Sequence, residues 1–231
     1  MKKCVVLFSG GIDSTTALYW ARARYAEVHA LTFDYGQRHR VEIRMARRIA
    51  RRLGIPHAVL RVDLARIGGS ALTDPRIAVP KHRRFLKTPG GPPATYVPFR
   101  NGILLALAAG WAEARGLTDL VCGFNTIDSP DYPDTRPAFI RAMTRAINAG
   151  TKAAFGSPPL RVVAPFVRMK KSGIIALGLA LGADYAHSIT CYSGAERPCG
   201  ACSACLLRAR GFREAGRPDP LLQRLQRKER S

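Results

Sequence analysis

A chain of 231 residues is long enough for one sizeable α/β domain with its own core, and too short for two full domains with linkers. Its 37 Lys and Arg residues outnumber its 16 Asp and Glu residues, which gives a net charge of +21 at pH 7. Such a field favours an anionic partner or substrate, although a generally arginine-rich protein would have the same balance. Charge alone therefore excludes no fold and specifies no chemistry.

The apolar segments exclude a secretory signal and a transmembrane helix. The N-terminal apolar run from Cys4 to Phe8 stops at Gly10, well short of a signal-peptide core. The longest apolar stretch elsewhere, 103–109, is soon followed by charged residues and is too short to span a bilayer. We therefore expect a cytoplasmic protein without a membrane segment.

Hydrophobic periodicity predicts strands alternating with helices. Apolar runs predict buried strands at 5–8, 28–33, 57–62 and 119–123. Helical periodicity predicts helices at 14–24, 41–53, 101–115, 137–148 and 174–181. The segment 68–93 is rich in Pro and Gly and has no sustained period, which predicts a long loop of the kind that often forms a lid. This alternation predicts an α/β fold with a doubly wound parallel sheet.

Two regional expectations follow from this organisation. We expect residues 1–185 to form the sheet domain and residues 186–231 to form a small cysteine-containing region packed on it. The helix at 41–53 carries a row of outward-facing arginines, which we expect to be a solvated face rather than a nucleic-acid contact. They are Arg44, Arg47, Arg48, Arg51 and Arg52.

A glycine-containing loop joins the first predicted strand to the first predicted helix. Glycine lets the backbone approach a ligand closely, and the start of a helix offers free N–H groups and the positive end of the helix dipole. A plain helix cap would use some of the same residues, but the complete string favours an anion-binding loop. No GxxxxGK[ST] string occurs, so this is not a Walker-type loop. The loop residues are Phe8, Ser9, Gly10, Gly11, Ile12, Asp13, Ser14, Thr15 and Thr16.

Four of the six cysteines form a C-x7-C-x2-C-x2-C array near the C-terminus. Four thiolates at this spacing can form a tetrahedral zinc site. The short turns between them supply backbone N–H groups, whose hydrogen bonds stabilise the negative charge of the thiolates. A redox dithiol or an iron–sulfur cluster would use similar spacings. We expect one structural zinc, distant from the chemistry. The array is Cys191, Cys199, Cys202 and Cys205, and the two remaining cysteines fall in predicted strands.

Three further polar segments, 32–39, 96–101 and 128–136, lie near predicted strand ends or before the buried helix. Doubly wound sheets bind ligands beyond the carboxyl ends of their strands. Each segment alone is typical of an ordinary loop. Together they predict one site at that edge of the sheet.

These segments together resemble the ATP pyrophosphatase (PP-loop) superfamily, whose fold is adenine nucleotide α-hydrolase-like, and within it the 7-cyano-7-deazaguanine synthase family. The resemblance runs from Phe8 to about Phe212 and rests on FSGGIDSTT, TFDYGQRH, VPFRN, YPDTRP and TCYSG with CGACSAC. It implies an ATP-dependent ligase of queuosine and archaeosine precursor biosynthesis. Such an enzyme adenylates 7-carboxy-7-deazaguanine, forms the amide with ammonia, and activates the amide with a second ATP to give the nitrile.

The resemblance also implies ATP, Mg²⁺ and Zn²⁺ as ligands, small-molecule substrates without nucleic acid, and a homodimer. It implies that the nucleotide is bound by Phe8, Ser9, Gly10, Gly11, Ile12, Asp13, Ser14, Thr15, Thr16, Ala17, Leu18, Thr32, Phe33 and Asp34. The implied catalytic and substrate-holding residues are Asp13, Ser14, Arg100, Asp128, Asp134, Arg136 and Lys171. The implied metal ligands are Cys191, Cys199, Cys202 and Cys205.

Other functions stay open at this point. The chain departs from the pattern of that family at Phe99, at 129–131 and at Thr135, so a related acceptor is an alternative. A PP-loop tRNA-modifying enzyme would suit the positive charge, but the length leaves no separate RNA-binding domain. A zinc-stabilised nucleic-acid-binding module would instead use a C-terminal arginine set. That set is Arg208, Arg210, Arg213, Arg217, Arg224, Arg227 and Arg230.

Overall fold

The computed structural model describes residues 2–82, 91–128 and 130–230. Its strands are β1 (Lys3–Leu7), β2 (Glu27–Asp34), β3 (His57–Arg61), β4 (Asp119–Val121) and β5 (Arg161–Val163). Its α-helices are α1 (Ile12–Arg22), α2 (Val41–Arg52), α3 (Arg100–Glu113), α4 (Pro137–Ala149), α5 (Lys171–Ala180), α6 (Ser203–Glu214) and α7 (Pro220–Arg230). Two 3-10 turns, η1 (Pro133–Thr135) and η2 (Lys152–Phe155), flank α4.

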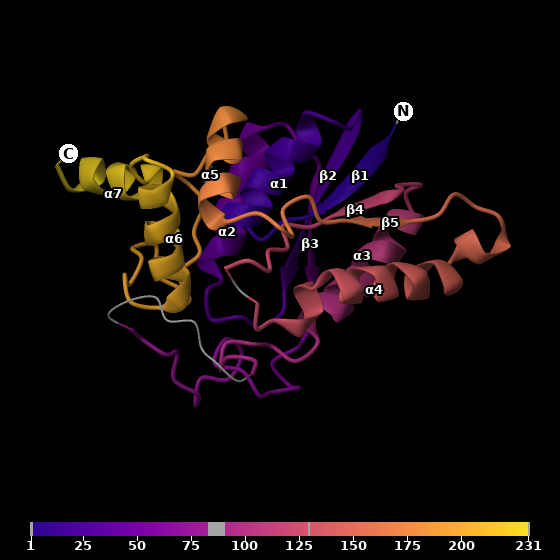
Figure 1. The fold of residues 1–231 in the computed structure, drawn as a ribbon, viewed down its shortest axis with the longest axis horizontal. Helices are drawn as coiled ribbons and strands as arrows, with labels where there is room; N and C mark the ends of the chain where they lie inside the picture. Colours follow the sequence, from indigo (N-terminus) through magenta and orange to yellow (C-terminus); the bar gives the residue numbers. More distant parts are fainter. Residues whose placement is uncertain (1, 83–90, 129, 231) are drawn as a thin grey trace.

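The five strands of the described residues form one parallel sheet in the order β3-β2-β1-β4-β5 (Figure 1). Central β1 pairs with β2 on one side and with β4 on the other. Its residues Cys4, Val5 and Val6 are completely buried, because helices cover both faces of the sheet. The doubly wound parallel sheet expected from the sequence is confirmed.

The helices form a layer on each face of this sheet (Figure 1). On one face α1, α2 and α5 enclose a core that includes Phe8, Leu18 and Ile174. On the other face α3 and α4 enclose a second core around Leu31 and Leu105. The winding direction changes between β1 and β4, so the loops that follow these two strands open beside each other. This edge of the sheet is where a ligand site is expected.

The residues after α5 pack directly on the sheet domain. Phe212 of α6 lies in the same core as Tyr185, with ring centroids 5.7 Å apart. Leu221 of α7 is completely buried in a cluster that includes residues of α2. A buried ion pair between Arg208 and Asp219, 2.6 Å long, joins α6 to the start of α7. The C-terminal region therefore shares its hydrophobic contacts with the sheet domain.

Several element boundaries differ from the sequence-based expectation. Helix α1 begins at Ile12 and α5 begins at Lys171, each earlier than predicted, because polar residues of their first turns face inward. Strand β5 was missed because three residues are too few to show a period. Helices α6 and α7 were missed because their apolar positions are interrupted by arginines. In the expected loop at 68–93, the described residues form neither helix nor strand, and 83–90 lie outside the described part.

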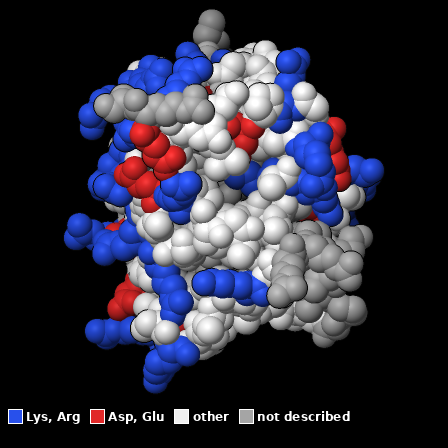
Figure 2. All heavy atoms as spheres, turned by 90° about the vertical axis from the view of Figure 1, so that its left-hand side faces the viewer, with Lys and Arg blue, Asp and Glu red and all other residues white. Residues whose placement is uncertain are grey.

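Positive charge is spread over the surface. Figure 2 looks onto the α6 and α7 end, where Lys and Arg side chains lie mostly around the rim of the face and its centre is largely uncharged. On α2, Arg44 and Arg52 pair with Glu196 and Asp184. Within the described ranges, no helix combines the length and the hydropathy that crossing a membrane requires.

Candidate active site

The loop after β1 is held in shape by the hydroxyl of Ser14. Its Oγ accepts hydrogen bonds from the N–H groups of Ser9 and Gly10, each 3.2 Å long, and donates to the carbonyl of Gly11 at 3.1 Å. No side chain of the described residues caps the start of α1 at Gly11. The N–H groups in the first turn of α1 are therefore available to an anionic ligand.

Glycine is required at two positions where backbone segments approach this loop. Gly10 has a φ of +86°, and a Cβ there would lie 2.8 Å from the carbonyl oxygen of Glu42 in α2. A Cβ on Gly123, just after β4, would lie 2.7 Å from the carbonyl carbon of Asp13 and 2.9 Å from the nitrogen of Ser14. Both clashes involve backbone atoms, which cannot rotate away. The loop is thus clamped between α2 and the end of β4.

Charged side chains link the loop to α5 and α6. The Nζ of Lys171 lies 2.5 Å from both carboxylate oxygens of Asp13. The carboxylate of Asp128 accepts a hydrogen bond from the backbone N–H of Lys171 at 2.5 Å and pairs with Arg210 of α6. Lys171 and Asp128 are buried, so their neighbours fix their positions more than water does. Each cation of this group faces at least one carboxylate, since Arg210 also lies 3.4 Å from Glu214.

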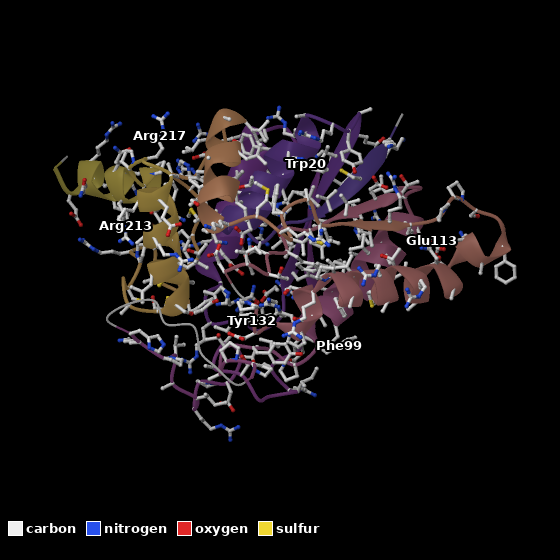
Figure 3. All side chains as sticks on the ribbon, viewed as in Figure 1. Trp20, Phe99, Glu113, Tyr132, Arg213 and Arg217 are labelled. Carbon is white, nitrogen blue, oxygen red and sulfur yellow. The ribbon has the colours of Figure 1, made fainter. Side chains whose placement is uncertain are left out.

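The loop faces a cavity of about 370 Å³, within the usual size range of small-molecule sites. Arg100, Tyr35 and Tyr132 also line it, together with Ser203, Ala204 and Leu207 of α6. Tyr132 lies between α6 and the start of α4 in the view of Figure 3. The cavity therefore combines an anion-binding loop with aromatic and cationic side chains.

Arg100 is one of the cations that line the cavity. Its Nη1 donates to the hydroxyl of Tyr35 at 3.1 Å, and its guanidinium lies 5.6 Å from the centre of the Tyr35 ring. Burial raises the pKa of Tyr35 above its usual value, although the charge of Arg100 opposes this. Tyr35 therefore stays protonated, and Arg100 keeps its full charge. Its guanidinium is suited to bidentate binding of a carboxylate.

Phe99, immediately before Arg100, has a strained backbone. Its φ of +50° is in the left-handed region that non-glycine residues seldom adopt. The ring is half exposed, covers Gly102 and meets Phe139 edge-on at 6.0 Å (Figure 3). The left-handed conformation explains why glycine, which has no Cβ, would fit this position more easily.

The predicted nucleotide-binding residues fall into two groups. Seven of them line the cavity: Phe8, Ser9, Gly11, Ile12, Asp13, Ser14 and Phe33. The others are not among its lining residues: Gly10, Thr15, Thr16, Ala17, Leu18, Thr32 and Asp34. Thr32 donates a hydrogen bond to the carbonyl of Phe8 at 2.5 Å, and Asp34 pairs with Arg40. Thr16 bonds to the buried hydroxyl of Tyr185.

The predicted catalytic residues are also divided. Asp13, Ser14, Arg100, Asp128 and Lys171 come from separate segments and line one cavity. The other two, Asp134 and Arg136, are not among its lining residues. Their roles stay predictions.

Asp134 and Arg136 occupy different surroundings. Asp134 is buried, and its Oδ2 accepts the backbone N–H of Asn101 at 3.0 Å, in the first turn of α3. Arg136 is exposed and donates to the carbonyl of Pro130 at 3.0 Å. Asp134 thus supports the helix that carries Arg100, whereas Arg136 braces the turn before α4. Thr135 does line the cavity, and position 129 lies outside the described residues.

Sequence reasoning missed Glu42 and Asn125, which line the cavity, and assigned no role to His39 and Tyr192, which lie in the singled-out segments TFDYGQRH and TCYSG and also line it. His39 belongs to the polar segment after β2, and Glu42 follows it three residues later, in the first turn of α2. That spacing was the available signal. Asn125 could not be found, because only the fold brings its segment to the loop.

The four cysteines of the C-terminal array are brought together, with all sulfur atoms within 4.8 Å of one another. Backbone N–H groups donate to Sγ of Cys191 and of Cys199, each at 3.3 Å, as around metal-bound thiolates. Hydrogen bonds from Cys202 and Cys205 hold the pKa of the Cys191 thiol far below its usual range. This cluster could bind a metal ion.

The cluster lies nearer the cavity than the sequence suggested. The cysteines themselves do not line the cavity, but Thr190, Tyr192 and Ser203, each adjacent to a cysteine, do. The expectation of a distant site is therefore replaced by a cluster directly behind one cavity wall.

The comparisons with known proteins agree with this site. Residues 3–216 match the model of the family described as Queuosine biosynthesis protein QueC. The chain belongs to this family. The resemblance to 7-cyano-7-deazaguanine synthases is thereby confirmed, and the match includes the loop, Arg100 and the cysteine array.

Two curated QueC-like relatives cover nearly the whole chain. The 7-cyano-7-deazaguanine synthase of Anaeromyxobacter sp. (strain Fw109-5) is 52% identical over 223 residues, which is 96% of each chain. The synthase of Azotobacter vinelandii (strain DJ / ATCC BAA-1303) is 48% identical and covers 95% of this chain and 97% of its own. A solved structure of a predicted tRNA methyltransferase subunit from Methanocaldococcus jannaschii is 18% identical, with a TM-score of 0.51 over 78% of this chain and 75% of that one. It shares the fold alone.

Proposed function

We propose that this QueC-family chain is an ATP-dependent carbon–nitrogen ligase that converts 7-carboxy-7-deazaguanine and ammonia to 7-cyano-7-deazaguanine, in queuosine and archaeosine precursor biosynthesis. The observation that carries the proposal is one cavity lined both by the anion-binding loop and by the half-buried Arg100. A free carboxylate is a poor electrophile. Its adenylate is a good one, because AMP is a stable leaving group.

The loop and α5 would handle the phosphates. The free N–H groups of the first turn of α1 would bind the phosphate oxygens, in the shape imposed by Ser14. Lys171, held by Asp13, would stabilise the charge that develops when the bond between the α and β phosphates breaks. The absence of a Walker string fits the release of AMP and pyrophosphate rather than ADP and phosphate.

The cationic and aromatic side chains of the cavity would hold the base. The guanidinium of Arg100 suits the substrate carboxylate, because charge-assisted bidentate bonds are among the stronger hydrogen bonds. Phe33, Tyr35 and Tyr132 offer aromatic surface to a flat ring. After ammonia has formed the amide, a second ATP at the same loop would activate the amide oxygen, which leaves with AMP to give the nitrile.

Two metal ions belong to this proposal. Asp13 and Asp128 bring carboxylate oxygens to the cavity, the donors that Mg²⁺ prefers, and the ion would neutralise phosphate charge. Cys191, Cys199, Cys202 and Cys205 offer the four sulfur donors typical of structural zinc. Their thiolates would hold the ion behind the wall formed by the start of α6.

The proposed partners are small molecules and a second copy of the chain. The interior of α3 carries no charged residue, and Leu107 and Phe99 are exposed on or beside it, which supports a homodimer through this face. Nucleic acid is not required in this proposal, since Arg208 and Arg210 of the C-terminal arginine set are engaged with Asp219 and Asp128. Free thiols in the cluster support a cytoplasmic location.

The test is product analysis with 7-carboxy-7-deazaguanine, ammonium and ATP, beside controls without the acid and with added tRNA. AMP, pyrophosphate and the nitrile are expected without tRNA. Ser14→Ala and Asp13→Asn should each lower turnover about a hundredfold, the usual cost of losing a group that stabilises transition-state charge. Formation of ADP and phosphate, or a nitrile that appears only with tRNA, would overturn the proposal.

A further inference from the structure

Glu42 is a buried acid at the cavity that the proposed adenylation does not use. It lies in the first turn of α2, is 7% exposed and lines the same cavity as the phosphate loop. Its backbone packs on the loop, since a Cβ at Gly10 would touch its carbonyl oxygen. The carboxyl group is therefore fixed beside the loop, away from bulk water.

The surroundings of this carboxyl group are polar but hold no close fixed cation. In the described part of the chain, the Nε2 of Gln37 donates to its Oε1 at 3.4 Å, and the Nε2 of His39 lies 3.4 Å from the same oxygen. Arg100 of α3 and Tyr35 at the end of β2 are the further titratable groups that act on it. The Nδ1 of His39 is buried and has no hydrogen-bond partner among the described residues.

These surroundings favour the protonated acid. Burial raises the pKa of Glu42 from 4.5 to about 8, against the opposing effects of the Gln37 hydrogen bond and the Arg100 charge. A carboxylate with such a value is a much stronger base than an ordinary glutamate and approaches the range of amines. Proton transfer between this carboxylate and a nitrogen nucleophile then has a free-energy change close to zero, which suits acid–base catalysis near neutral pH.

The proposed reaction must remove protons from nitrogen at several steps. Attack of ammonia on the acyl adenylate forms the C–N bond, breaks the C–O bond to AMP and releases one N–H proton. Conversion of the amide to the nitrile releases the two remaining N–H protons as the oxygen leaves with the second AMP. Ammonium, the main form near neutral pH, must also lose a proton before it can attack.

We propose that the carboxylate of Glu42 is the ammonium-binding group and general base of this cavity. This role rests on the proposed function. Ammonium binds at Oε1 and Oε2 and transfers one proton to the carboxylate. The nitrogen lone pair that is thereby freed attacks the acyl carbon. The same carboxylate, after releasing its proton to solvent through the open cavity, accepts the protons lost in amide and nitrile formation. Gln37 and His39 hold its orientation.

The test separates adenylation from the steps that involve nitrogen, using Glu42→Gln. Glutamine keeps the side-chain shape but cannot accept a proton. Acid-dependent exchange of pyrophosphate into ATP, measured without ammonium, should stay within about twofold of the wild-type rate, whereas nitrile formation should fall by about a hundredfold or more. The wild-type rate of nitrile formation should rise with pH up to about 8, and the variant should lack this titration. Glu42→Asp should restore part of the activity.

Glu113→Gln on α3 is the matched control, because it removes a carboxylate that lies far from Tyr132 in Figure 3 and does not line the cavity. It should leave both activities unchanged. Absence of acid-dependent exchange in the wild-type protein would refute the proposed function itself. With that exchange present, a Glu42→Gln variant that makes nitrile at the wild-type rate, or that loses exchange and nitrile formation equally, would overturn the role of Glu42 alone. If Glu42→Gln does not fold, Glu42→Asp decides: retained exchange with slowed nitrile formation is expected, and unchanged nitrile formation refutes the role.

Discussion

Gly123→Ala should inactivate the enzyme by displacing the phosphate loop. The glycine follows β4, and the added methyl carbon would lie 2.7 Å from the carbonyl carbon of Asp13, 2.8 Å from its oxygen and 2.9 Å from the nitrogen of Ser14. Ordinary contacts of a Cβ lie between 3.4 and 4 Å. Either the loop or the end of β4 must therefore move by about half an ångström to one ångström.

This displacement sets the expected magnitudes. Overpacking of a fixed backbone contact costs about 1–3 kcal/mol of unfolding free energy. A shift approaching 1 Å in groups that position a reacting phosphate costs on the order of a hundredfold in rate. Urea unfolding measures the first quantity, and pyrophosphate release with saturating ATP and acid measures the second.

Gly110→Ala in α3 is the control, because nothing lies within 4 Å of a Cβ at this position. The same substitution there should stabilise the helix by about 0.5–1 kcal/mol and leave the rate unchanged. Wild-type turnover in Gly123→Ala, with unchanged stability, would show that the loop is not clamped by β4 and would refute the reasoning.

Three further outcomes are expected. Cys202→Ser, or removal of the bound metal with a chelator, should lower the melting temperature before it selectively lowers turnover, because thiolate ligation contributes folding free energy. Iron found by elemental analysis, or unchanged stability, would contradict this. Asp134→Ala should cost about 1–2 kcal/mol of stability, because it leaves the N–H of Asn101 without a partner, and it should lower turnover of the free base. The double variant Arg47→Ala/Arg51→Ala, at two exposed positions, should match the wild type. Loss of activity only in this double variant would instead favour an RNA substrate. Between pH 4.5 and about 8 the carboxyl group of Glu42 is protonated in the folded state and ionised in the unfolded state. The free energy of unfolding should therefore decrease as the pH rises through this range. In urea titrations at several pH values, Glu42→Gln should show a smaller decrease than the wild type.

The sequence determined the fold class and the chemistry of the loop, because both depend on local order along the chain. The continuous apolar run of β1 is buried because helices cover both faces of the sheet, and such runs alternating with helices are typical of a parallel sheet. The string from Ser9 to Ser14 combines glycines with hydroxyls at a strand-to-helix junction, and its function needs only that junction. The spacing of the cysteine array likewise predicted a cluster that could bind a metal ion.

Only the tertiary structure decided which distant groups share the cavity. The contact of Lys171 with Asp13, and of Asp128 with Arg210, depends on how α5 and α6 pack beside α1, and no local pattern encodes that distance. The protonation of Glu42 also depends on burial by segments far apart in the chain, since the same carboxyl group in water would be an ordinary acid. Periodicity reports which face of a helix is buried, but packing decides what that face meets.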